Sequence, residues 1–368
     1  MTHAVRTATD SGLSSHPAIA ADRLGREQLA ALQIQRLRQT VRWAFERVPW
    51  YHRRFTSAGI SPDDIRTLSD LAHWPFITKD DLRAAYPRGL FAVPLDEVLR
   101  LHASSGTTGK QVLIPYTRFD LHVWTEVMTR VLTWFGVRPG DVLQNAYGYG
   151  LFTGGLGFHD GAEALGATVI PVSGGNTDRQ IVLLQDFGTT VMCCTPSFFL
   201  HVADRALEVG VDLRRLQLRV GVFGAEPWSE EMRQRIQQAA GIEAFDIYGL
   251  AEIVGPGVAA ECPAHQGLHV LEDHFYPEVI DPVSGQGVPD GQPGELVLTT
   301  LSKQALPMLR YRTGDMTAIC PGPCPCGRTL RRIRRVSHRS DDLFIVKGVN
   351  VFPAQIEAAL LAVEGTLP

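Results

Sequence analysis

The stretch from residue 142 to residue 223 decides the fold, and it opens with VLQNAYGYGLFTGGLGFHDGAEALGATVI. Short apolar segments alternate along it with segments whose apolar residues recur every three or four positions. The predicted strands are 142–146, 167–172, 190–195 and 218–223. The predicted helices within the stretch are 157–165, 177–187 and 198–209, and a further helix is predicted just before it, at 121–135. Strands that alternate with helices predict a layered α/β domain with a largely parallel sheet.

The flanking sequence extends this domain in both directions. Upstream, apolar residues recur at helical spacing over 28–55, where Pro49 interrupts the pattern, and 98–102 is predicted as a strand. Downstream of Gly255, β-rich segments at 278–281 and 295–300 are separated by turns, which predicts a smaller β-rich subdomain. Residues 1–25 are predicted as a flexible tail, and 353–362 as the beginning of a helix.

Composition and charge exclude several classes of protein. The 368 residues carry a net charge of -4, and 45% of them are hydrophobic. No apolar run approaches the roughly 18 residues of a membrane span, and no segment reads as a secretory signal, so we expect a cytoplasmic protein. The charge balance does not favour nucleic-acid binding, and a small molecule is the expected partner. The sequence leaves a homodimer open.

A loop rich in hydroxyl groups and glycine follows the strand predicted at 98–102. It reads SSGTTGK, from Ser104 to Lys110. Glycines allow backbone amides to approach phosphate oxygens, hydroxyl groups add donors, and lysine adds a positive charge. The loop is therefore a candidate phosphate-binding loop, although its glycine spacing is not that of a Walker A motif. The alternative is a surface turn of small polar residues.

Four motifs resemble, in order and spacing, those of the adenylate-forming enzyme superfamily. They are the loop at 104–110, YGLAE at 248–252, YRTGD at 311–315 and RSDD at 339–342. Two further segments, DHFYPE at 273–278 and GVNVFP at 348–353, resemble phenylacetate–CoA ligase and its aryl-CoA ligase relatives. The resemblance covers residue 41 to about residue 362.

The resemblance implies a large N-terminal adenylate-forming domain and a two-step reaction. A carboxylate and ATP give acyl-adenylate and pyrophosphate, and in the complete enzyme the acyl group then passes to coenzyme A. Glu252 is the implied Mg²⁺ ligand, and Lys110, Glu252 and Arg339 are the implied catalytic residues. The implied phosphate-binding residues are Ser104, Ser105, Gly106, Thr107, Thr108, Gly109 and Lys110. The implied nucleotide-binding residues are Gly224, Ala225, Glu226, Asp246, Tyr248, Gly249, Asp315 and Arg339. Each residue has a structural alternative, such as a core position for Tyr248.

The acyl substrate is expected to lie against aromatic rings. Tyr147, Tyr149 and Phe152 alternate with glycines in YGYGLF, a composition suited to stacking a planar acid. By resemblance, Tyr147, Phe152 and Ile247 line an aryl site. The alternative is the edge of a core strand followed by a glycine-rich loop.

A cysteine cluster indicates a structural zinc site. Cys324 and Cys326 project from one tight turn, and Cys262 with His269 completes a Cys₃His set of the kind that holds structural Zn²⁺. His265 is a rival fourth ligand, and Cys320 is a rival thiol. The alternative is a group of free reduced cysteines.

The resemblance also implies domain boundaries. The adenylation domain is expected at 26–338, a hinge at 339–342 with Asp341 as its pivot, and the start of a C-terminal domain at 343–368. Relatives continue into a small domain that we expect to be largely absent from this chain. Three hypotheses follow: an aryl-CoA ligase without its terminal domain, a stand-alone aryl acid adenylase that serves an amine, hydroxyl or carrier-protein acceptor, and a non-catalytic nucleotide-binding scaffold.

Overall fold

The computed structural model describes residues 21–104, 111–339, 344–346, 349–351 and 356. It corrects the end of the tail predicted at 1–25, because Ala21–Arg23 form the 3-10 helix η1 and Asp22 is buried. The Asp22 carboxylate accepts hydrogen bonds from Arg130 at 2.6 Å and from the Trp134 indole at 2.7 Å. A buried charged partner thus anchors residues that composition alone assigns to a loose tail.

The centre of the fold is a nine-stranded mixed sheet, which confirms the predicted α/β class. Its strand order is β13-β14-β9-β8-β7-β6-β5-β3-β4. The parallel half contains β3 (Val142–Asn145), β4 (Thr168–Ile170), β5 (Val191–Cys194), β6 (Val220–Phe223) and β7 (Glu243–Leu250). β5 and β6 are buried along their whole length, as expected for strands covered on both faces.

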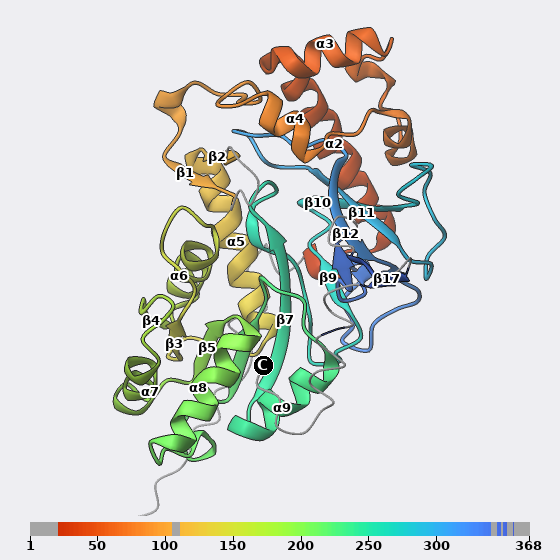
Figure 1. Cartoon of the computed structure of the whole chain (residues 1–368). Helices are drawn as coiled ribbons and strands as arrows, with labels where there is room; N and C mark the ends of the chain where they lie inside the picture. The colour runs from red at the N-terminus through yellow and green to blue at the C-terminus, as the bar shows by residue number, and fades with distance from the viewer. Residues whose placement is uncertain (1–20, 105–110, 340–343, 347–348, 352–355, 357–368) are drawn as a thin grey trace, which may run out of the picture.

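Helices lie beside the parallel half of the sheet, and α6 to α8 gather on one side of the molecule in Figure 1. They are α5 (Arg118–Trp134), α6 (Gly154–Leu165), α7 (Thr177–Asp186), α8 (Pro196–Glu208) and α9 (Glu230–Ala240). α5 and α6 approach closely because α6 carries glycine where they meet: a Cβ at Gly161 would lie 2.4 Å from Cβ of Met128. Among the described helices, none has both the length and the apolar character of a membrane span.

The main sheet continues past β7, and the β-rich subdomain predicted after Gly255 corresponds to a smaller antiparallel sheet that begins at residue 275. β8 (Gly255–Ala260) turns back against β7, and β9 (Leu268–Val270), β14 (Arg332–Ile333) and β13 (Ile319–Cys320) complete the sheet. The smaller antiparallel sheet consists of β10 (Phe275–Ile280), β11 (Gly294–Thr300), β12 (Tyr311–Thr317) and β15 (His338–Arg339). The change in sequence texture at Gly255 therefore marks a tight reversal of the chain.

The last described strands are β16 (Phe344–Val346) and β17 (Val349–Val351), which form a hairpin. Except for residue 356, the helix predicted at 353–362 lies outside the described residues. The same holds for Asp341 and for most of the segment assigned to a C-terminal domain.

The N-terminal region packs its helices at one end of the molecule, where Figure 1 shows α2, α3 and α4 together. α2 (Arg26–Arg47) ends before Pro49, at which α3 (Pro49–Ser57) begins, so the predicted break is confirmed. α4 (Lys79–Ala84) follows two 3-10 helices, η2 (Pro62–Asp64) and η3 (Leu68–His73). The shorter 3-10 helices η4 (Leu95–Glu97) and η5 (Leu213–Arg215) lie in later connections. β1 (Arg100–Ala103) and β2 (Leu113–Tyr116) form an antiparallel pair on either side of residues 105–110.

A buried ion network ties α5 to the rest of the core. Arg130 is 1% exposed and bonds Asp22 as well as both carboxylate oxygens of Asp273, at 2.8 and 3.1 Å. Burial alone would raise the pKa of Asp273, but His274, Arg130 and Arg36 outweigh it and hold that pKa well below its usual range. Asp273 therefore stays ionised inside the protein.

Candidate active site

A cavity of about 200 Å³ opens where β7, the start of α6 and the end of β1 meet. Seven residues implied by the sequence line it: Ser104, Tyr147, Phe152, Ala225, Ile247, Gly249 and Glu252. They come from four separate segments of the chain. The fold thus brings the predicted acyl site and the implied metal ligand into one space.

Ser104 is the only residue of the phosphate-loop motif within the described part of the chain. It follows β1, lines the cavity, and is 6% exposed. Its Oγ is buried and has no hydrogen-bond partner among the described residues. A buried hydroxyl without a partner is unfavourable, so this oxygen is suited to bind a ligand. Ser105, Gly106, Thr107, Thr108, Gly109 and Lys110 lie outside the described residues.

Glu252 lies in the turn between β7 and β8 and is 5% exposed. The turn is so tight that residue 249 must be glycine, because a Cβ at this position would lie 1.9 Å from the Gly255 carbonyl oxygen. The hydroxyl of Tyr116 donates to the Val254 carbonyl at 3.0 Å, and Nζ of Lys303 donates to the Glu252 carbonyl at 3.1 Å. The carboxylate is thus presented to the cavity from a braced backbone rather than from a solvated helix.

Tyr248, Asp315 and Arg339 form one connected group. The Tyr248 hydroxyl donates to Oδ2 of Asp315 at 2.5 Å, and Arg339 donates to Oδ1 at 3.2 Å. Asp315 and Arg339 are also directly opposite in the β12–β15 pair. Burial and the Asp315 carboxylate raise the pKa of Tyr248 well above its usual value, so the phenol remains a donor. Three of the eight residues that the family resemblance assigns to the nucleotide therefore lie together.

The segment assigned to the adenine edge is constrained by its backbone. A Cβ at Gly224 would lie 2.4 Å from the Ile247 carbonyl oxygen, and Ala225 has a φ of 71°. The Glu226 carboxylate accepts a hydrogen bond from the Ser197 amide at 2.8 Å. Asp246 accepts one from Arg335 at 3.0 Å, and burial raises its pKa. Ala225 faces the cavity, whereas Glu226 and Asp246 brace its surroundings and are not among the lining residues.

The side of the cavity assigned to the acyl substrate is lined by a stacked aromatic pair. The Tyr147 ring stacks on Phe158 with centroids 5.1 Å apart and planes 6° from parallel. The Tyr147 hydroxyl donates to the Cys194 carbonyl at 2.6 Å, which fixes the ring. Phe152 is 43% exposed and borders the opening.

The structure places Tyr149 differently from Tyr147, and its assignment to the acyl site remains a prediction. Its hydroxyl accepts a hydrogen bond from the Asn145 side-chain amide at 2.7 Å and lies 3.2 Å from Nδ1 of His159. It is not among the residues that line the cavity. The YGYGLF pattern could not distinguish the two tyrosines, because Asn145 holds Tyr149 only after the chain has folded.

Two lysines near Glu252 were given no role by the sequence. Lys79, the first residue of α4, lines the cavity. Lys303 is 6% exposed, and burial lowers its pKa to about 8, which leaves the ammonium charged at neutral pH. The capping signal at Thr78 places Lys79 at a helix start, but no local signal shows that Lys79 lines the cavity or that Lys303 binds the Glu252 carbonyl.

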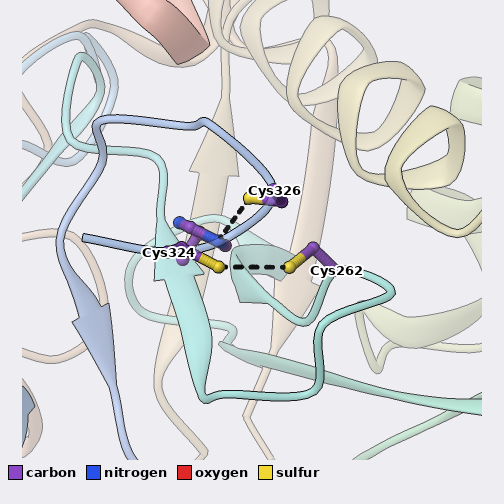
Figure 2. A group of neighbouring side chains, drawn as sticks. Cys262, Cys324 and Cys326 are labelled. Carbon is purple, nitrogen blue, oxygen red and sulfur yellow. Dashed lines mark hydrogen bonds between the residues drawn. The ribbon is translucent and has the colours of Figure 1, made fainter.

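Cys262, His269, Cys324 and Cys326 converge as predicted, with one ligand atom from each within 4.8 Å of the others. The sulfurs of Cys262 and Cys324 are 3.7 Å apart, and Figure 2 shows them facing each other. The sulfur of Cys326 is 3.3 Å from Nε2 of His269. Tetrahedral Zn²⁺ with bonds of roughly 2.0–2.3 Å places such atoms about 3.5–3.8 Å apart, so the group has the right size.

The histidine in this cluster has the tautomer that a metal ligand needs. Its Nδ1 donates to the Leu330 carbonyl at 3.2 Å, which leaves the Nε2 lone pair directed at the thiols. Burial lowers the pKa of His269 to about 4, so the ring is neutral. Four protein donors leave no open position for substrate.

The rival ligands lie outside the cluster. His265 is near Arg233 at 2.9 Å and near Glu261 at 3.3 Å, with a φ of 48°. Cys320 is not in the group of four either. The spacing of the sequence alone left both open, because it does not specify that His269 sits on β9 beside β14.

The fold and the cavity together define an adenylate-forming enzyme, and comparison with known proteins agrees. Residues 61–302 match the family described as AMP-binding enzyme. Phenylacetate-coenzyme A ligase of Pseudomonas putida is 54% identical over 90% of this chain and 75% of its own length. The ligase of the same name from Thermus thermophilus is 52% identical over 94% of this chain and 78% of its own.

Solved structures show the same fold. The crystal structure of 2-hydroxyisobutyryl-CoA ligase in the postadenylation state, with a bound acyl-AMP, matches with a TM-score of 0.88 and 30% identity. The match covers 94% of this chain and 75% of that one. The chain therefore belongs to the AMP-binding enzyme family, in its phenylacetate–CoA ligase branch.

Proposed function

We propose that this protein activates an aromatic carboxylic acid, with phenylacetate as the first candidate, to acyl-AMP and then forms its coenzyme A thioester. The single observation that carries the proposal is the cavity in which the stacked Tyr147–Phe158 pair and Glu252 line one space. An aryl ring against the pair places its carboxylate within the same cavity as the implied metal ligand. The 51–54% identity to phenylacetate-coenzyme A ligases supports the choice of acid.

In the first step a carboxylate oxygen attacks the α-phosphorus of ATP, the new P–O bond forms, and the bond to pyrophosphate breaks. Ser104 Oγ is placed to donate to a phosphate oxygen, and Lys79 brings a cation to the cavity wall. Asp315 is suited to accept hydrogen bonds from ribose hydroxyls, with Tyr248 and Arg339 holding its carboxylate. Bound Mg²⁺, with Glu252 as its protein ligand, would neutralise charge on the leaving pyrophosphate. In the second step the thiol of coenzyme A attacks the acyl carbonyl carbon and AMP leaves.

Pyrophosphate release with a panel of acids tests the substrate class. Phenylacetate, benzoate and amino- or hydroxybenzoates are compared with short fatty acids at equal ATP and Mg²⁺. We expect the aromatic acids to give the larger kcat/KM, and Glu252→Gln to suppress release with every acid. A response to fatty acids alone contradicts the aryl claim. No release with any acid instead favours the non-catalytic scaffold.

We further propose that Cys262, His269, Cys324 and Cys326 hold one structural Zn²⁺. The donor set, the 3.7 and 3.3 Å separations and the neutral His269 tautomer support this assignment. The ion would join the loop after β8 to the 324–326 turn, so that these segments need less apolar core.

We also propose an adenylation domain at 26–338, a hinge at 339–342 and a cytoplasmic location. These assignments rest on the sequence and on its resemblance to the family. The acceptor is proposed as coenzyme A rather than an amine, hydroxyl or carrier protein, because the most similar relatives described above carry coenzyme A in their names.

A further inference from the structure

Lys303 is a buried cation that the proposed reaction does not yet use. It lies in the connection from β11 to β12 and is 6% exposed. Its Nζ donates to the Glu252 carbonyl oxygen at 3.1 Å and lies 5.0 Å from the centroid of the Tyr116 ring. Burying an ammonium group costs free energy unless the group is paired or hydrogen-bonded, so the burial of Lys303 beside the Glu252 carbonyl needs an explanation.

The turn that carries Glu252 is held at its carbonyl groups by two side chains. Tyr116 donates to the Val254 carbonyl at 3.0 Å and reaches that of Ala251 at 3.5 Å, while Lys303 binds residue 252 itself. Within the turn, the Ile253 and Val254 amides both donate to the Leu250 carbonyl, at 3.1 and 3.2 Å. Lys303 thus fixes the peptide group next to the implied metal ligand.

The backbone beside Lys303 is anchored in turn by α5. The Asp120 carboxylate accepts hydrogen bonds from the amides of Gln304 at 2.6 Å and Ala305 at 3.0 Å. Asp120 is itself held in the cap that Thr117 forms at the start of α5. Asp120 and Glu252 both stabilise the charged form of Lys303. A rigid helix start, a buried cation and the Glu252 turn therefore form one continuous support.

Lys303 also borders a second cavity, of about 360 Å³, on the other side of this support. The exposed side chains of Phe119 and His122 line that cavity, so it is accessible from solvent. Glu252 lines the first cavity and Lys303 lines the second. Removal of the lysine side chain would therefore extend the second cavity toward the Glu252 carbonyl.

We infer that Lys303 is a positioning residue for adenylation: by binding the Glu252 carbonyl it holds that carboxylate at the metal- and phosphate-binding side of the cavity. The inference rests on the proposed function. Methionine, a neutral unbranched side chain one atom shorter than lysine, would fill most of the space but supply neither the hydrogen bond nor the positive charge beside the Glu252 carbonyl. The consequence is a specific defect at Glu252, separate from a general loss of stability.

The test compares Lys303→Met and Lys303→Ala with Leu184→Ala, which creates a cavity in the core beneath α7 and touches neither cavity described above. We expect Lys303→Met to raise the Mg²⁺ concentration for half-maximal pyrophosphate release about tenfold, with less than threefold change in KM for the acid. In Lys303→Ala, propylammonium, which replaces the missing Cγ to Nζ, should restore at least a third of the lost rate, whereas propan-1-ol should not. Leu184→Ala should lower the melting temperature without changing the Mg²⁺ requirement.

Hydrogen exchange of the peptide covering 250–255 gives a readout independent of turnover. Lys303→Met should accelerate exchange there at least tenfold relative to both the wild-type protein and Leu184→Ala. Exchange equal to that of Leu184→Ala, or a wild-type Mg²⁺ requirement in Lys303→Met, overturns the inference. If the wild-type protein releases no pyrophosphate, the proposed function fails, and the exchange comparison still decides whether Lys303 holds the turn.

Discussion

Glu252 and Asp315 are the two carboxylates on which the proposed chemistry depends, and the protein holds them in different ways. Glu252 is fixed through its backbone, by Lys303 and by the tight β7–β8 reversal. Asp315 is fixed through its oxygens, by Tyr248 and Arg339. In the proposed reaction, Glu252 would use its oxygens to bind a metal, and Asp315 would share or exchange its hydrogen bonds when a nucleotide binds.

Replacing Asp315 with Asn tests its proposed role at the ribose. The variant loses charge-assisted hydrogen bonds worth about 1.5–3 kcal/mol, which predicts a KM for ATP raised roughly 10- to 100-fold. The KM for the aromatic acid should change less than threefold, because Asp315 is not among the residues that line the cavity. Steady-state kinetics with each substrate varied in turn measure both values. Tyr248→Phe, which removes one hydroxyl partner, is the milder control, and an equal rise in both KM values would argue against the assignment.

Asp273 predicts a pH dependence of stability. Its folded pKa is depressed, so its contribution is present above the unfolded value of about 3.9 and is lost as pH falls below it. Asp273→Asn should lower the free energy of unfolding at pH 7 by about 3–5 kcal/mol, because Arg130 is left partly unpaired in the core. The gap to the wild-type protein should narrow between pH 5 and pH 3.

Denaturant unfolding across that pH range measures the effect. The matched control is Asp63→Asn, which removes an exposed ion pair with Arg42 and should cost less than about 1 kcal/mol. A gap that stays constant down to pH 3 would show that Asp273 is not held ionised by its neighbours.

At the scale of elements, the strands and helices between 142 and 223 could be predicted, because their apolar residues recur with the spacing and over the lengths that are typical of strands and helices. The pairing of β8 and β9 with the main sheet could not be predicted, because the sequence of a strand does not specify which strand it pairs with. The surroundings of Tyr149 could not be predicted for a related reason: alternation of Tyr and Gly predicts aromatic rings, but the hydrogen bond from Asn145 forms only in the folded chain. Lys303 was missed because its importance arises from the meeting of α5 with the β11–β12 connection.

The cysteine cluster is proposed to hold one zinc ion, and metal analysis tests this proposal. Protein purified without chelator should hold about one equivalent of zinc, and Cys326→Ser should lose most of it with a lower melting temperature. A strong chelator should lower the melting temperature of the wild-type protein and leave that of Cys326→Ser unchanged. Pyrophosphate release below the melting temperature should survive, since all four ligands belong to the protein and none lines the cavity.

Cys320→Ser and His265→Ala are the controls, because neither residue belongs to the group of four. Both should keep their zinc. Well under one equivalent in the wild-type protein, or an equal loss in Cys320→Ser, would contradict the assignment.

At the scale of the whole molecule, the site is assembled from segments between Lys79 and Arg339. The order of four motifs made the family predictable, and with it the association of Tyr248, Asp315 and Arg339. The proposed selection of an aryl acid rests on the stacking of Tyr147 on Phe158, which joins the β3–α6 loop to α6. Such a contact is a property of the packed molecule.

The central claim is that a carboxylate oxygen of an aromatic acid attacks the α-phosphorus of ATP in this cavity. The most direct measurement uses phenylacetate labelled with ¹⁸O in both carboxylate oxygens and follows the label by mass spectrometry. One labelled oxygen should appear in AMP after coenzyme A is added, because attack at the acyl carbon leaves the bridging oxygen on phosphorus. Unlabelled AMP, or ADP as the nucleotide product, would contradict the account.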